Sequence, residues 1–154
     1  MRSLGFIVLT MVLMACNSND KTAPEEEENS AFNFENFTGR FQEAALPYQI
    51  TDTSLLNNKD TTGIRNAAFA AMIPDSIKQK MVGKTTGIKL VPLARFDAPG
   101  AEHYFIIKAV AAEKKAALLM TFDAAGAYTA SIPFLVPDNE ASTTQNSVID
   151  KGYN

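Results

Sequence analysis

The residue of this chain with the clearest chemistry is Cys16, the only cysteine among 154 residues. It follows Leu13-Met14-Ala15 at the end of an apolar run that begins at Leu4, and a basic residue, Arg2, precedes that run. A charged start, an apolar middle and a small residue at the exit are the parts of a secretory signal. A thiol placed directly after the exit is a nucleophile that can accept a lipid as a stable thioether. We therefore expect Cys16 to be lipidated.

The stretch Leu13-Met14-Ala15-Cys16 resembles the lipobox of bacterial lipoproteins, and this resemblance covers residues 1–16. It implies diacylglycerol transfer to the Cys16 thiol, cleavage between Ala15 and Cys16, and acylation of the new amino terminus. Residues 1–15 are then a lipoprotein signal peptide. Each buried CH₂ contributes about 0.8 kcal/mol, so two or more acyl chains hold a protein durably on a membrane. We expect an extracytoplasmic protein anchored in the outer membrane through lipid on Cys16.

Two other interpretations of this stretch leave Cys16 without a role. The apolar run could belong to an ordinary signal peptide, or to a buried amino-terminal helix. A permanent span is not expected, because the run is about 11 residues long and a transmembrane helix needs roughly 20. No second long apolar run follows in the sequence.

Residues 16–31 are polar and contain the acidic run Glu25, Glu26, Glu27 and Glu28. Consecutive like charges repel one another and keep a chain extended, so we expect a disordered tether. The same acidic cluster also resembles the surface-export signals of lipoproteins from the Bacteroidota. The sequence leaves open whether the protein faces the periplasm or the cell surface.

Four carboxylates are the main candidates for catalysis, namely Asp97, Glu102, Asp123 and Asp138. A pair of carboxylates is the usual machinery of glycoside hydrolysis. Asp97 and Asp123, however, stand where hairpins need turn-forming residues. The alternative hypothesis that they support is a small carboxylate-dependent hydrolase that acts on cell-envelope glycans.

Other motifs for chemistry are incomplete. Gly83-Lys84-Thr85-Thr86 matches half of a phosphate-binding loop, but Lys78 stands where the first glycine belongs. The single histidine, His103, could act in a hydrolase only with a nucleophile, and the sequence contains no Gly-x-Ser-x-Gly motif. We therefore expect His103 to be a surface residue at the end of a strand. We expect no catalytic, cofactor-binding or metal-binding residue and no cofactor, and we favour a non-enzymatic domain over an enzyme.

The net charge of the chain argues against a nucleic-acid partner, and its length argues for a single domain. The chain carries a formal charge of −3, which becomes one unit more negative when Arg2 leaves with the signal. Its basic residues are spread among acids, so we expect no nucleic-acid partner. The chain left after residue 15 is enough for one domain and too short for two cores. We place this domain at residues 32–154, where phenylalanines begin to recur.

Two short helices are expected in the middle of the domain. Ile64, Ala68 and Met72 recur at four-residue spacing, which predicts a helix within residues 64–73. Pro74 suits the first turn of a second helix, and Gly83 is placed to end it in the left-handed conformation.

The second half of the domain has the pattern of strands with short connections. We predict strands at residues 88–96, 104–111, 116–122 and 128–136, a last strand from 148, and a short extended segment at 46–50. Connections this short form hairpins rather than crossovers. The sequence therefore predicts an α+β fold, an antiparallel β-meander of four to five strands packed with one or two short helices. Pro133 places its strand at an edge, and alternation puts Tyr128, Ile132 and Phe134 on one face.

The middle of the chain is similar to uncharacterised lipoproteins of the Bacteroidota, in which Pro-Asp follows an apolar run and a hairpin carries Phe-Asp-x-x-Gly. Here these are Pro74-Asp75 and Phe96-Asp97-Ala98-Pro99-Gly100. The resemblance implies no known activity. We expect a non-enzymatic binding or assembly domain whose partner is an envelope protein or a glycan. If the chain is instead a fragment of a larger domain, its last strand should lack a neighbour.

Overall fold

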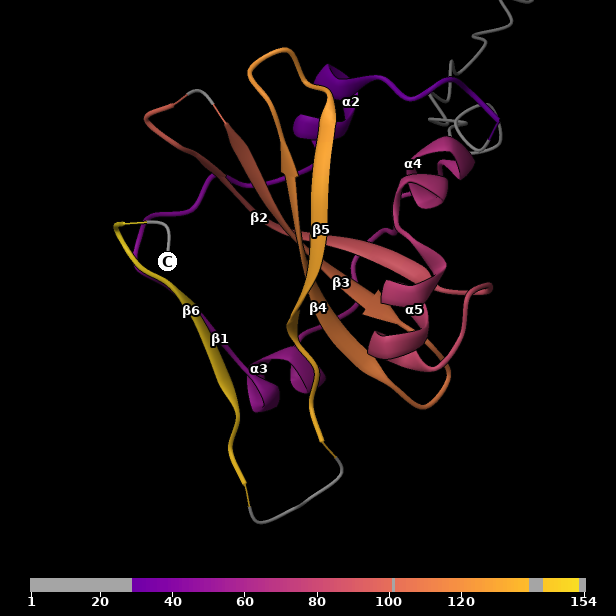
Figure 1. Ribbon diagram of the computed structural model, residues 1–154. Helices are drawn as coiled ribbons and strands as arrows, with labels where there is room; N and C mark the ends of the chain where they lie inside the picture. Colours follow the sequence, from indigo (N-terminus) through magenta and orange to yellow (C-terminus); the bar gives the residue numbers. More distant parts are fainter. Residues whose placement is uncertain (1–28, 101, 139–142, 153–154) are drawn as a thin grey trace, which may run out of the picture.

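The main sheet contains the four predicted strands. The computed structural model describes residues 29–100, 102–138 and 143–152. Each strand is antiparallel to the next in the order β2-β3-β4-β5, which confirms the predicted meander and the α+β class (Figure 1). The strands are β2 (Lys89–Asp97), β3 (His103–Val110), β4 (Lys115–Phe122) and β5 (Tyr128–Leu135).

The two predicted helices correspond to α4 (Ala67–Met72) and α5 (Asp75–Val82). The first begins later than predicted because Asn66 is its cap, and the Asn66 side chain accepts the Phe69 N–H at 2.8 Å. The second ends at Gly83 with φ of 70°, as predicted.

Two further short helices were not predicted, α2 (Phe34–Thr38) and α3 (Asp52–Asn57). Both start at a capping side chain, Asn33 in α2 and Thr51 in α3, each of which accepts a backbone N–H. In the part of the chain that the structure describes, no helix has the length and apolar character needed to cross a membrane.

A second, two-stranded sheet joins β1 (Tyr48–Thr51) to β6 (Asn146–Ile149) in antiparallel register. These are the predicted extended segment and the predicted last strand. The last strand therefore has a neighbour, and it begins two residues earlier than predicted. The pairing continues past β1, because the Asp52 N–H donates to the Gln145 carbonyl and the Asp52 carboxylate accepts the Gln145 N–H.

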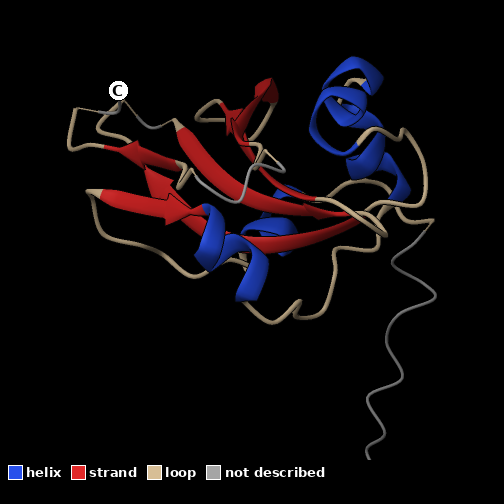
Figure 2. Ribbon diagram, turned by 90° about the horizontal axis from the view of Figure 1, so that it is seen from below, coloured by secondary structure: helices blue, strands red, loops and turns tan. Residues whose placement is uncertain are grey.

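Both faces of the main sheet are covered, as Figure 2 shows by helices on either side of the strands. The first core lies between the sheet and α2, α4 and α5, and contains Phe37, Phe69, Met81 and Phe105. The second core lies against α3, β1 and β6, and contains Ile50, Leu55, Ile106 and Ile149. Central strand β3 is therefore apolar on both faces, with neighbours Ile106 and Ile107 in different cores.

The two edge strands of the main sheet each carry a proline beside a register shift, Pro92 in β2 and Pro133 in β5. The predicted edge position of Pro133 is confirmed. Bulges and prolines make an edge a poor template for further pairing. The edge of β2 also receives other segments of the chain, because the Ala44 N–H donates to the Arg95 carbonyl at 3.0 Å and the Ile64 N–H to the Leu90 carbonyl at 2.7 Å.

The hairpin between β4 and β5 depends on Gly126, which has φ of 78°. A Cβ at this position would lie 2.6 Å from two atoms of the Phe34 ring. We expect Gly126→Ala to lower the free energy of unfolding by about 2–4 kcal/mol, as the sum of backbone strain and overpacking. The measurement is urea unfolding followed by circular dichroism.

Gly100 provides a matched control, since it lies in the hairpin between β2 and β3 and a Cβ there would meet nothing within 4 Å. Gly100→Ala is expected to change the unfolding free energy by less than about 0.5 kcal/mol. Equal effects of the two substitutions would show that Gly126 tolerates a side chain.

Candidate functional site

The candidate carboxylate Asp123 holds its own hairpin turn. Its Oδ1 accepts the backbone N–H groups of Ala125 and Ala127, both at 2.9 Å. This is the turn chemistry that its position in the sequence predicts.

Asp97 and His103 face each other across the start of the β2–β3 hairpin, with Oδ1 and Nδ1 2.7 Å apart. The His103 ring also contacts the Phe34 ring, with centroids 5.1 Å apart. Only 23% of the His103 side chain is exposed, so this residue is more enclosed than the strand-end surface position that we predicted.

The other two candidate carboxylates have local partners as well. Glu102 accepts the Tyr104 hydroxyl at 2.8 Å. Asp138 accepts the Gln145 side-chain amide at 2.9 Å and the Thr143 hydroxyl at 3.2 Å. Within the described ranges, no three histidine, cysteine or acidic side chains gather as ligands for a metal ion.

The half-motif Gly83-Lys84-Thr85-Thr86 follows α5, and Gly83 serves as the left-handed cap of that helix. The predicted lipidation and cleavage residues, Cys16 and Ala15, lie outside the described residues, as do Glu25, Glu26, Glu27 and Glu28. At the end of the predicted tether, the Asn66 side chain donates to the Ser30 carbonyl at 3.1 Å.

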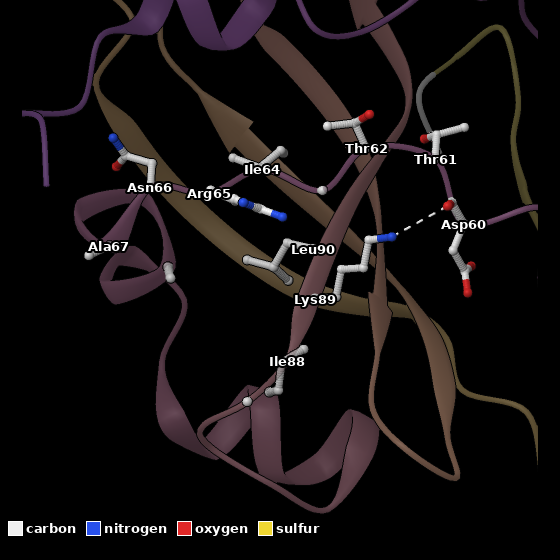
Figure 3. A pocket seen from close by; sticks show the side chains of 13 residues that line it. Asp60, Thr61, Thr62, Ile64, Arg65, Asn66, Ala67, Ile88, Lys89 and Leu90 are labelled. Atoms are coloured by element: carbon white, nitrogen blue, oxygen red, sulfur yellow. Dashed lines mark hydrogen bonds between the residues drawn. The ribbon is translucent and has the colours of Figure 1, made fainter. Parts of the chain in front are cut away.

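One cavity beside the main sheet was not predicted from the sequence. It is an open groove of about 910 Å³ beside the start of β2, and we call it the β2 groove. The groove is lined by residues 60–67, by Ala70 and by residues 87–90 (Figure 3). It thus lies between the loop before α4, α4 itself and the edge of the sheet.

Two cationic side chains, Arg65 and Lys89, line the β2 groove, and both are exposed. Figure 3 shows the Arg65 guanidinium directed toward the strand that carries Lys89. The Lys89 ammonium donates to the Asp60 carbonyl at 3.3 Å. No carboxylate of the described residues forms an ion pair with Arg65 or Lys89, so both keep their charge available to a ligand.

The carboxylate of Asp60, at the end of the groove, pairs with two other lysines. Its oxygens lie 2.7 Å from the Lys108 ammonium and 3.2 Å from that of Lys115. The Lys108 ammonium, and then that of Lys115, hold the pKa of the Asp60 carboxyl below its usual value. Asp60 therefore does not neutralise the cations of the groove.

Lys108 is a charged residue inside the second core, with 1% of its side chain exposed. Its ammonium also donates to the Asn58 carbonyl at 3.1 Å, so one buried lysine holds both ends of the 58–60 segment. Buried charges need such partners, because desolvation without them is costly. The wall of the β2 groove is thereby fixed to the central strand.

The sequence carried a signal for Lys108, since this lysine interrupts the apolar strand at 104–111 and faces the same way as Ile106. Its partner Asp60 had no comparable signal, because the loop around it has no apolar periodicity. No known protein family, no curated protein and no solved structure matches this chain.

Proposed function

We propose that this protein is a lipoprotein of the cell envelope, anchored in the outer membrane by lipid on Cys16, whose domain binds another envelope component. The observation that carries the anchor is the sequence Leu13-Met14-Ala15-Cys16 behind a short apolar run. Charged start, run length, exit residue and cysteine agree independently with a lipidation signal.

The β2 groove supports the binding role of the domain. It is concave, it has both cationic and apolar lining residues, and its wall is held by the Lys108–Asp60 pair. Binding sites combine a preformed hollow with a few polar groups that orient the ligand. A non-enzymatic binding domain makes use of these features without any catalytic group.

The alternative of a glycan hydrolase has less support. The structure describes Asp97, Asp123 and Asp138 in contacts within or beside their own turns, with His103, backbone N–H groups and Gln145 as partners. No observation among the described residues brings two of these carboxylates to one cavity.

Lipid anchoring is tested by Cys16→Ala in the full chain. We expect the amount in the outer-membrane fraction to fall about tenfold or more, because the acyl chains supply the membrane affinity. The protein should appear in the soluble fraction or as an uncleaved precursor. The measurements are density-gradient fractionation and intact mass, which shows both the lipid and a first residue at position 16.

A matched control is Ser18→Ala, which changes one small side chain two residues after Cys16 and keeps Cys16 itself. It should remain lipidated and in the outer membrane. Cleaved Cys16→Ala protein that still fractionates with the outer membrane would rule out the lipid anchor.

A further inference from the structure

The β2 groove lies in the most basic part of the domain. Acids are few between residues 59 and 95, where only Asp60 and Asp75 occur. Asp60 pairs with Lys108 and Lys115, and Asp75 pairs with Lys78 at 2.9 Å. The cations of the same segment are Lys59, Arg65, Lys78, Lys80, Lys84, Lys89 and Arg95, of which Arg95 pairs with Glu43 at 3.5 Å. This surplus of positive charge favours an anionic ligand.

The polar end of the β2 groove has the groups that hold an anion. Arg65 supplies a planar guanidinium and Lys89 an ammonium. The hydroxyl-bearing residues Thr61 and Thr62 also line the groove. A carboxylate or a phosphate accepts hydrogen bonds from all of these groups, and charge-assisted bonds are the stronger kind.

The part of the groove that borders α4 and the start of β2 has apolar lining residues. A second recess, of about 280 Å³, lies between α4 and α5 and is lined mainly by apolar side chains. It shares Ala67, Ala70, Gly87, Ile88 and Leu90 with the β2 groove, so the two hollows adjoin one another. Ala71, Ile73 and Met81 complete the apolar lining, and Lys78, Thr85 and Thr86 form its polar part. A ligand that fills both hollows needs an anionic end and an apolar end.

We propose that the β2 groove binds an amphiphile, with a carboxylate or phosphate head on Arg65 and Lys89 and a single aliphatic chain in the recess between α4 and α5. This inference rests on the proposed binding role of the domain and not on the lipid anchor. Burial of the chain supplies affinity, whereas the cations select the head group.

The groove is held open by contacts within the protein. The Ile64 N–H donates to the Leu90 carbonyl at 2.7 Å, and the Lys89 ammonium to the Asp60 carbonyl at 3.3 Å. Gly63 allows this close approach, since a Cβ there would lie 3.0 Å from the Lys89 side chain. A preformed site loses less entropy when it binds, so the ligand is not required to order the loop.

The test uses the purified full chain and a dodecanoic acid with a diazirine at its chain end. After illumination, peptide mass spectrometry locates the adducts. We expect them in α4, in α5 and at residues 85–90. Unlabelled dodecanoate and dodecyl phosphate are then compared as competitors, which distinguishes a carboxylate head from a phosphate head. Dodecanol lacks the charge and inorganic phosphate lacks the chain, so both should compete poorly.

Two groove variants and one control define the site. The double variant Arg65→Gln, Lys89→Gln should reduce labelling about tenfold, since it removes two charge-assisted contacts. Ala67→Phe, at an exposed position that lines both hollows, should reduce it by blocking the chain. Lys84→Gln removes an exposed charge that lines neither hollow and should leave labelling unchanged. Circular dichroism confirms that each variant is folded.

Three outcomes would overturn the proposal. They are adducts scattered over the surface, labelling that is equal in the Arg65→Gln, Lys89→Gln variant and the control, and competition by dodecanol as strong as that by dodecanoate. Purified protein is labelled irrespective of where it resides in the cell. Failure of this test is therefore distinct from failure of the Cys16→Ala fractionation, which tests the anchor alone.

Discussion

Replacement of Phe37 by alanine is expected to lower the free energy of unfolding by about 3–5 kcal/mol, the range for loss of a buried phenylalanine. Phe37 is 3% exposed and lies at the centre of the first core. Its ring centroid is 4.7 Å from that of Phe69, 4.8 Å from that of Phe105 and 4.9 Å from that of Phe41. Alanine leaves a cavity between α2, α4 and β3 that these rings can only partly fill.

Urea unfolding of the purified chain measures this effect, with Leu56→Ala as the control. Leu56 belongs to α3 and is 47% exposed, so its truncation should cost less than about 1 kcal/mol. If both substitutions cost the same, the segment around α2 does not contribute to the core, and residue 32 is the wrong place for the start of the folded domain.

The meander was predictable because the composition of its strands and the residues of its turns both indicate hairpins. Residues such as Val, Ile, Leu and Phe gather in short runs, and Asp123 and Gly126 between two of them have the side chains that a hairpin turn requires. The bounds of the four meander strands differ from the prediction by one residue at most, as in β3, which runs from His103 to Val110.

The predicted faces of β5 were wrong, and bulges are the reason. Alternation placed Tyr128, Ile132 and Phe134 on one face. In the structure Tyr128 packs against the first core and Phe134 against the second, while Ile132 is 53% exposed. The register shifts twice along β5, and each shift exchanges the faces for all the residues beyond it. A strict period of two cannot reveal an inserted residue.

The helices α2 and α3 were missed because each is too short to show periodicity. Helix α3 fully buries only Leu55, and helix α2 directs only Phe34 and Phe37 toward the first core, so neither run is long enough to establish a helical period. The available signals were the caps Asn33 and Thr51, and polar residues of these types are also common in loops. Packing rather than propensity decides whether such short segments are helical.

The β2 groove could not be predicted from the sequence, because it depends on tertiary packing and not on a local pattern. Its lining comes from a loop, a helix and a strand edge, and only the tertiary fold brings Arg65 and Lys89 to one groove. The Lys108–Asp60 pair likewise joins residues far apart in the chain. By contrast, the proposed lipidation of Cys16 depends on adjacent residues, so it could be predicted from the sequence alone.

Replacement of Asp60 by alanine is expected to lower the unfolding free energy by about 3–5 kcal/mol, the cost of an unpaired buried charge. The Lys108 side chain that it leaves is only 1% exposed. Lys108→Met should cost less, because Asp60 is 25% exposed and keeps its contact with Lys115. Both variants lose the same ion pair, so the difference between them comes from how deeply the remaining charged side chain is buried.

The double variant Asp60→Ala, Lys108→Met should recover most of the stability lost in Asp60→Ala, because a methionine in the second core has no charge to desolvate. Urea unfolding of the two single variants and the double variant forms a complete cycle. If the two losses add instead, Lys108 is solvated in the absence of Asp60, and the pair does not fix the loop. In that case the wall of the β2 groove depends on the Ile64–Leu90 hydrogen bond and on Gly63 instead.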